Sequence, residues 1–196
     1  MTKPPPDVYQ LKITLLGTKP PIWRRLLVPS NITFEDLHSA LQIAMGWQDY
    51  HLHQFTAGDR NIGVPDPDSR AMGMHIEDER KVRLSDAIHE VGSKILYTYD
   101  FGDSWDHNIV LEKILPWDPD TAYPVCLGGK LAGPPEDCGG IPGFYNLLET
   151  LADPDSEEHE SMLTWVGEGY DPKAFSIDDV NKEFAPALRR VTSRKP

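Results

Sequence analysis

The densest group of chemically useful side chains lies in the segment 100–107. Asp100, Asp103 and Asp106 supply carboxylates at a spacing of three, and His107 follows directly. Carboxylate oxygens together with an imidazole nitrogen form a ligand set that suits zinc, manganese or iron. The sequence therefore predicts a candidate site for a divalent transition metal ion, zinc or manganese, in this segment.

Two further imidazoles lie upstream of this segment. His51 and His53 are two residues apart in a pattern typical of a strand, so both side chains would point to one face. A structural alternative exists, because Asp and Gly in a hairpin loop satisfy backbone donors and tolerate positive φ, while Trp105 would cover the core. The candidate metal ligands are His51, His53, Asp100, Asp103 and His107.

A second candidate segment is the loop 133–140. Two prolines restrict its start and two glycines free its end, so its polar side chains are expected just before a helix. Glu136 is the candidate general base of a metal-dependent hydrolase. Cys138, near a helix N-terminus, is a candidate nucleophile because such positions lower a thiol pKa. Two alternatives remain open: plain packing of a buried thiol, and joint metal binding by Cys126 and Cys138.

A basic cluster at 23–25 offers a charge partner for the acidic turn. Successive strand residues point to opposite faces, so just one of Arg24 and Arg25 can face the carboxylates. A charge-assisted pair with Asp100 or Asp103 would neutralise the turn without a metal. The candidate binding residues are therefore Arg24, Asp100, Asp103, Trp105, Glu136 and Asp137.

The remaining histidines are interpreted as surface or helix-side residues rather than as metal ligands. They are His38, His75, His89 and His159. The chain also lacks a glycine-rich phosphate loop, a nucleophile elbow and a zinc-protease helix motif.

Hydrophobic periodicity indicates the elements that position these residues. Alternation predicts five strands, at 9–15, 22–28, 51–57, 94–99 and 107–115. Thr33 is expected to cap a helix that Gly46 ends. Ser85 is expected to cap a short helix that Gly92 ends. Residues 58–80, rich in Asp, Pro, Gly and Arg, are interpreted as an irregular or weakly paired excursion.

The composition changes after Pro116. A Pro- and Gly-rich stretch, 117–143, precedes three helical patterns at 143–151, 157–165 and 177–190. The last of these has Ser176 as its predicted cap and an apolar stripe formed by Ile177, Val180, Phe184 and Leu188.

Hairpins rather than regular βαβ crossovers favour an α+β fold on a largely antiparallel sheet, with packed helices and a C-terminal helical segment. We expect one domain over 1–196. Its sheet-rich part would span 8–116, and its loop and helical part would span 117–191.

Four motifs occur in one order along the chain: PPIWRR at 20–25, GW to HLHQF at 46–55, YDFGDSWDH at 99–107 and PPEDCGG at 134–140. Together they resemble the plasmid pRiA Orf-three-like family, whose members are sometimes labelled as the mobile-element passenger protein TnpR. The resemblance covers about residues 8–185. It implies an α+β fold, a plasmid or mobile-element setting and no settled biochemical activity. No motif joins a nucleophilic Ser to an Arg cluster, as serine recombination would need.

Charge is distributed unevenly along the 196 residues, whose formal net charge is −12. Residues 1–99 carry 11 basic and 12 acidic groups, whereas residues 100–183 carry 4 basic and 19 acidic groups. So acidic a surface repels phosphate backbones, which makes nucleic acid an unlikely partner. A protein partner with a basic surface, a small cationic ligand or a metal ion is the expected counterpart.

The chain has no apolar run that could span a membrane, no secretory signal and too few cysteines to staple a secreted fold. A cytoplasmic location is therefore expected. The leading functional expectation is a binding or interaction module with an acidic cleft between the 100–107 turn and the 134–140 loop. The alternatives are a metal-dependent hydrolase and a nucleic-acid-associated passenger protein.

Overall fold

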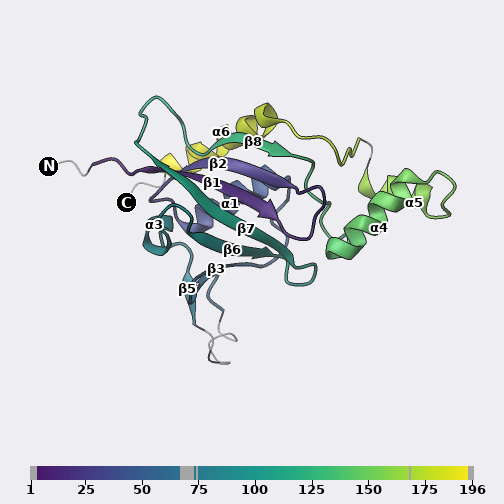
Figure 1. The fold of residues 1–196 in the computed structure, drawn as a ribbon, viewed down its shortest axis with the longest axis horizontal. Helices are drawn as coiled ribbons and strands as arrows, with labels where there is room; N and C mark the ends of the chain where they lie inside the picture. Colours follow the sequence, from purple (N-terminus) through teal and green to yellow (C-terminus); the bar gives the residue numbers. More distant parts are fainter. Residues whose placement is uncertain (1–3, 67–72, 74, 168, 194–196) are drawn as a thin grey trace.

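The computed structural model describes residues 4–66, 73, 75–167 and 169–193. Its centre is an eight-stranded sheet in the order β5-β4-β3-β6-β7-β1-β2-β8 (Figure 1). The strands are β1 (Val8–Leu15), β2 (Trp23–Pro29), β3 (His53–Ala57), β4 (Arg60–Gly63), β5 (Ile76–Asp78), β6 (Lys94–Tyr99), β7 (Trp105–Leu115) and β8 (Val125–Lys130). All neighbouring strands are antiparallel except β4 and β5, which are parallel. The expected α+β fold on a largely antiparallel sheet is confirmed.

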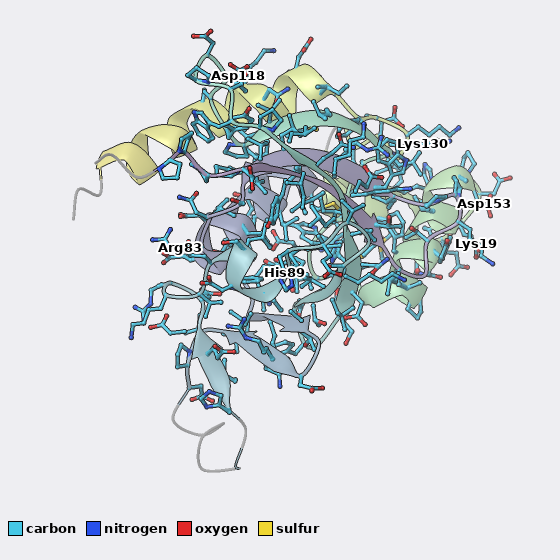
Figure 2. The ribbon with its side chains drawn as sticks, turned by 60° about the vertical axis from the view of Figure 1, so that its left-hand side comes forward. Lys19, Arg83, His89, Asp118, Lys130 and Asp153 are labelled. Carbon is cyan, nitrogen blue, oxygen red and sulfur yellow. The ribbon has the colours of Figure 1, made fainter. Side chains whose placement is uncertain are left out.

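Within the part of the chain that the structure describes, five helices accompany the sheet: α1 (Phe34–Met45), α3 (Leu84–Ala87), α4 (Gly140–Ala152), α5 (His159–Val166) and α6 (Ile177–Ser193). Figure 1 shows α1 behind the sheet, α6 beside β8, and α4 with α5 extending from one end. Lys19, in the β1–β2 connection, lies near α4 (Figure 2), and its N–H donates to the hydroxyl of Tyr145 at 2.7 Å. Within the described residues, no helix is both long and apolar enough to cross a bilayer.

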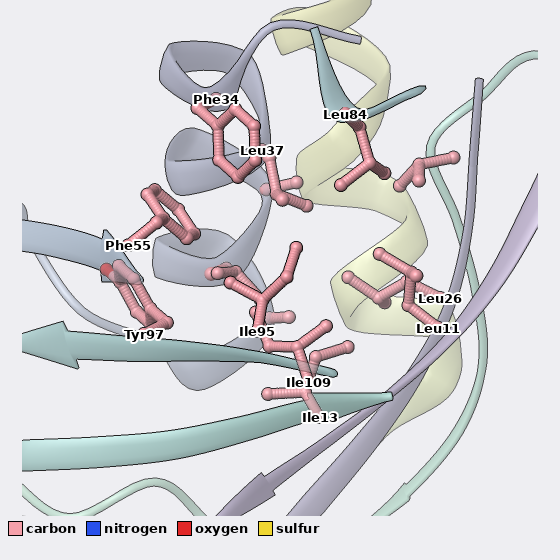
Figure 3. Packing of buried hydrophobic residues seen from close by; sticks show 14 of the residues in the cluster. Leu11, Ile13, Leu26, Phe34, Leu37, Phe55, Leu84, Ile95, Tyr97 and Ile109 are labelled. Atoms are coloured by element: carbon pink, nitrogen blue, oxygen red, sulfur yellow. The ribbon is translucent and has the colours of Figure 1, made fainter. Parts of the chain in front are cut away.

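The core lies between the sheet and α1. Leu11, Ile13 and Leu26 of the sheet pack toward Phe34 and Leu37 of the helix (Figure 3), and each is at most 1% exposed. Full burial of such a side chain contributes about 1.5–3 kcal/mol. The alternation in β1 and β2 therefore fixes which face meets the helices. The opposite face stays half-exposed along β2, whereas at the start of β1 Val8 and Gln10 on that face are also buried.

Local signals set the bounds of α1 as expected. The Thr33 side chain accepts a hydrogen bond from the Asp36 N–H at 3.1 Å. Gly46 ends the helix in the left-handed region at φ 83°, where its N–H reaches the carbonyl of Gln42. This places the loop that follows Gly46 at the end of the sheet where the candidate residues gather.

Several sequence-based boundaries are wrong. For the 58–80 stretch, of the two alternatives irregular and weakly paired, the second is observed, because it contains two short strands, β4, which forms a hairpin with β3, and β5. The third strand begins at His53 rather than His51. Ser85 does not cap α3, which begins one residue earlier, and Asp86 instead accepts a hydrogen bond from the Arg83 N–H at 3.0 Å.

The Pro- and Gly-rich stretch contains the edge strand β8, which the sequence does not predict and which pairs with β2. Its outer edge is held by α6, where Asn181 both accepts from the Cys126 N–H and donates to the Cys126 carbonyl. In α6 the predicted stripe is partly observed. Phe184 is buried and Val180 packs on the core, whereas Ile177 is exposed and the side chain of Leu188 lies outside those described.

Candidate functional site

The turn after β6 and the loop before α4 are in direct contact. The turn begins and ends at Asp100 and Ser104, both at positive φ, 55° and 53°. Between them, Asp103 accepts a hydrogen bond from the Gly139 N–H at 3.1 Å. A Cβ at Gly140 would lie 2.5 Å from the carbonyl oxygen of Asp103, so glycine permits this close approach.

His51 lies where three loops meet. Its Nε2 is 3.0 Å from Oδ1 of Asp137 in the loop before α4, and 3.7 Å from Oδ2 of Asp100 in the turn. This nitrogen is buried, yet neither carboxylate is aligned with it for a hydrogen bond. The Asp137 side chain is 65% exposed and that of Asp100 is 11% exposed, so the group opens to solvent on the Asp137 side. The three ligand atoms lie within 4.8 Å of one another.

Three large apolar residues that adjoin His51 and Asp100 in the sequence are exposed. Tyr50 and Leu52, on either side of His51, are 72% and 66% exposed, and Phe101, next to Asp100, is 53% exposed. Large apolar groups that gather at an exposed polar site are typical of an interaction surface. We call these six residues the His51 surface: Tyr50, His51, Leu52, Asp100, Phe101 and Asp137.

Glu136 has both carboxylate oxygens engaged. The hydroxyl of Tyr99 donates to Oε1, and the N–H of Gln48 donates to Oε2 at 2.8 Å. The N–H of Tyr50 in turn donates to the Tyr99 hydroxyl at 3.0 Å. Burial and the nearby Glu136 raise the pKa of Tyr99 above its usual range. In this geometry Glu136 holds the loop before α4 against the loop after α1 and the end of β6.

Neither cysteine has the environment of a nucleophile. Burial, reinforced by the negative charge of Asp103, raises the pKa of Cys138 to about 12, so the thiol stays protonated at neutral pH. Burial also raises the pKa of Cys126. Among the described residues, neither thiol belongs to a group of three or more potential metal ligands, which gives no support to their joint metal binding.

Of the two interpretations of His38, helix-side or surface, the surface one is wrong: the residue lies on α1 but is buried. Its ring is buried and stacks face to face on that of His53, with the centroids 3.4 Å apart. Nε2 of His38 hydrogen-bonds Asp49 at 2.8 Å, and Nδ1 contacts the hydroxyl of Tyr97 at 2.8 Å. Nε2 of His53 hydrogen-bonds Glu79 at 2.7 Å. Burial lowers the pKa of His38 to about 4, so the ring is neutral at pH 7.

His107 and Trp105 are core residues. His107 is fully buried, its Nδ1–H donates to the Trp105 carbonyl at 2.9 Å, and burial lowers its pKa to about 4. The Trp105 side chain is also fully buried, as the structural interpretation of the turn expects, and does not face solvent. Asp106 lies on the half-exposed face of the sheet, where it accepts from the Thr98 hydroxyl at 2.6 Å.

The expected pair between an arginine and the carboxylates of the turn is wrong. Arg24 is buried, and its Nε donates to the carbonyl of Ala44 at 2.6 Å and its Nη1 to that of Lys130 at 3.2 Å. Arg25, on the opposite face, forms a bidentate pair with Glu112 at 2.6 and 3.0 Å. The two arginines are therefore committed elsewhere.

The five predicted metal ligands do not form one group. His51 and Asp100 lie together with Asp137, whereas His53 lies with His38 and Asp49. Asp103 and His107 belong to neither group of described residues. Sequence reasoning missed Asp49, Glu79 and Tyr99. Asp49 is marked only as a polar residue after the helix stop at Gly46, and Glu79 only as an acid in an irregular stretch. Tyr99 is marked only by its inward position on β6.

A shallow groove of about 630 Å³ lies on the half-exposed face of the sheet. Arg25, Glu112 and Leu127 are among its lining residues, and it contains none of the predicted site residues. It is therefore distinct from the acidic cleft that the sequence predicts between the two loops.

Comparison with known proteins places the chain in a clear context. Residues 7–179 match the model of the plasmid pRiA4b ORF-3-like protein family. The uncharacterised protein y4hQ of Sinorhizobium fredii is 40% identical over 194 residues, covering 96% of this chain and 98% of its own. The crystal structure of MM3350 from Methanosarcina mazei, titled a protein of unknown function, has a TM-score of 0.79 and 41% identity, covering 88% of this chain and 97% of its own.

Proposed function

This chain belongs to the plasmid pRiA4b ORF-3-like family, and from that premise we propose that it is a binding module rather than an enzyme. Its ligand is a basic segment of a partner protein, and the His51 surface receives it. The observation that carries this proposal is the junction of His51, Asp100 and Asp137, in which two carboxylates from separate loops converge on one partly exposed point.

Charge supports a cationic ligand. Arg24 and Arg25, the arginines expected to pair with the turn, bind other groups. Arg24 donates to backbone carbonyls, and Arg25 donates to Glu112. Neither arginine therefore pairs with the carboxylates of Asp100 and Asp137, whose near neighbour is His51. A guanidinium or ammonium group placed between them gains a charge-assisted hydrogen bond to each.

The apolar rim supports a ligand with a long side chain. Lys and Arg carry an apolar stem below the charged group, and that stem packs on exposed apolar surface. Tyr50 and Leu52, the sequence neighbours of His51, and Phe101, the neighbour of Asp100, are exposed and offer such surface. The aromatic rings also attract a cation that lies over their faces. A bare metal ion would use none of this rim, which favours a basic peptide over an ion at this site.

The alternatives have less support. A hydrolase would need the predicted ligands in one group and a free general base, whereas those ligands are divided and Glu136 has both oxygens engaged. Nucleic-acid binding is opposed by the acidic charge of residues 100–183. A cytoplasmic setting, in which thiols remain reduced, fits the two free cysteines.

An array of Arg- and Lys-containing peptides, followed by titration calorimetry of the best ligand, tests the proposal. Asp137→Asn keeps the size and the left-handed backbone preference of an exposed residue but removes its charge. We expect it to weaken binding about tenfold, equivalent to about 1.4 kcal/mol. The matched control is Asp153→Asn, an exposed carboxylate at the end of α4. Equal affinity of the Asp137 variant and the wild type, or no peptide binding at all, contradicts the proposal.

A further inference from the structure

We propose that His38, Asp49 and His53 form a binding site for a divalent transition metal ion, most favourably zinc. This site is distinct from the His51 surface and does not rest on the function proposed above. The three residues come from α1, the loop after it and β3, and their ligand atoms all lie within 4.8 Å of one another. Two imidazoles and one carboxylate are a common protein ligand set for zinc and for non-haem iron.

The spacing of these atoms is close to what an ion requires. Zinc binds nitrogen and oxygen at about 2.0–2.2 Å, so two ligands of one ion lie no more than about 4.4 Å apart. The imidazole rings of His38 and His53 stack face to face, with their centroids 3.4 Å apart, so their in-plane lone pairs do not converge as the rings stand, and metal binding requires one ring to rotate about its Cβ–Cγ bond. Asp49, whose side chain is 60% exposed, leaves an open route from solvent, while both imidazoles are almost fully buried.

The groups behind the ligands hold them in place. The hydroxyl of Tyr97 contacts Nδ1 of His38 and also accepts from the Gln42 side-chain amide at 3.0 Å. Oε1 of the same Gln42 accepts from the Asp49 N–H at 3.0 Å. One Gln–Tyr pair thus orients two of the three proposed ligands. Hydrogen bonds of this kind to the second ring nitrogen of a histidine accompany most metal-bound imidazoles.

Metal binding at these rings requires a change of tautomer. Nε2 of His38 and Nε2 of His53 each face a carboxylate, those of Asp49 and Glu79. A metal ion takes the Nε2 lone pair, so the proton of a neutral ring moves to Nδ1 without net release. At His38 the Tyr97 hydroxyl serves either tautomer, because a hydroxyl both donates and accepts. Glu79, buried beside His53, is the hydrogen-bond partner that the Nε2 atom of this ring exchanges for the ion.

The experiment uses tag-free protein treated with EDTA, titrated with ZnCl2 by calorimetry and with CoCl2 by visible absorbance. We expect one equivalent of either ion, with cobalt bands typical of nitrogen and oxygen ligands. Nitrogen NMR should report a shift of both Nε2 atoms on zinc binding. Asp49→Asn, at an exposed position that tolerates its positive φ of 59°, should weaken zinc binding at least about tenfold.

His53→Gln should abolish binding, and His51→Gln and His159→Gln are the controls that should retain it. If His53→Gln does not fold, the Asp49 variant and the wild-type NMR shifts still decide the question. The proposal is overturned if less than about a tenth of an equivalent binds, if Asp49→Asn binds zinc as the wild type does, or if His51→Gln is the variant that loses the ion. The last outcome would place the metal at the His51 surface instead.

Discussion

The hydroxyl of Tyr99, at the end of β6, donates a hydrogen bond to Glu136 in the loop before α4. Glu136 also accepts from the backbone N–H of Gln48, so one carboxylate joins three segments that are distant in sequence. The same carboxylate brings Asp137 next to His51. The geometry of the His51 surface therefore depends on Glu136, a neighbouring residue whose two carboxylate oxygens are already engaged.

Glu136→Ala is expected to lower the free energy of unfolding by about 1–3 kcal/mol, because it leaves the Tyr99 hydroxyl and the Gln48 N–H without their acceptor. Urea denaturation measures this change, and amide hydrogen exchange should quicken most at residues 134–139. The exposed Glu149 of α4 gives a matched control, Glu149→Ala, for which we expect less than about 0.5 kcal/mol. Equal stability of the two variants would show that the contact holds nothing in place.

Arg24→Met is expected to be far more destabilising than Arg25→Met. Removal of the buried Arg24 guanidinium leaves the Ala44 and Lys130 carbonyls without a donor, at a cost of about 3 kcal/mol or more. Arg25 loses a part-exposed ion pair with Glu112, worth about 1 kcal/mol or less. Thermal and urea unfolding of both variants test the ranking. The reverse order would contradict the assignment of Arg24 to the core.

The elements that the sequence predicts well are those with local causes. Alternation in β1 and β2 needs no knowledge of the partner strand, since one face must be buried in any sheet. Likewise the cap at Thr33 and the stop at Gly46 are set by residues within one turn of the helix. The prediction that the 100–107 turn and the 134–140 loop approach each other came from their unusual composition, and Asp103 does contact Gly139.

The elements and roles that it predicts poorly depend on contacts distant in sequence. Strand β8 contains two glycines and is held by Asn181 of a later helix, which no local pattern reveals. His38 is a polar residue on a helix, and its burial depends on the His53 ring beyond the next loop. His107 is an exception with a local signal. It lies two residues before Ile109 and four before Leu111 on β7, so the alternation that buries these two residues also buries His107.

Cys138 is expected to be slow to alkylate in the folded protein. Its pKa, raised to about 12 by burial, leaves almost no thiolate at pH 7.5. Iodoacetamide labelling followed by mass spectrometry should therefore show both cysteines far less reactive than in urea. Rapid labelling of Cys138 in the native state would contradict its interpretation as a buried packing residue and would support a role as a nucleophile.

The protein is expected to lose stability as the pH falls from 6.5 toward 4, before most carboxylates titrate. His107 is neutral when buried, with a pKa of about 4, whereas in the unfolded chain its pKa is near 6.5. The unfolded state therefore binds more protons in this window. As a result, this residue lowers the free energy of unfolding by on the order of 3 kcal/mol between pH 6.5 and pH 4. His38 acts in the same direction.

His107→Asn separates the two contributions, because its amide can replace the Nδ1–H donor to the Trp105 carbonyl but does not titrate. Between pH 6.5 and 4.5 the variant should show a slope of unfolding free energy against pH that is smaller by up to about 1.4 kcal/mol per pH unit. Urea denaturation at half-unit steps provides that slope independently of the overall stability of the variant. Identical slopes would mean that His107 titrates normally, which a fully buried ring beside an apolar core does not do.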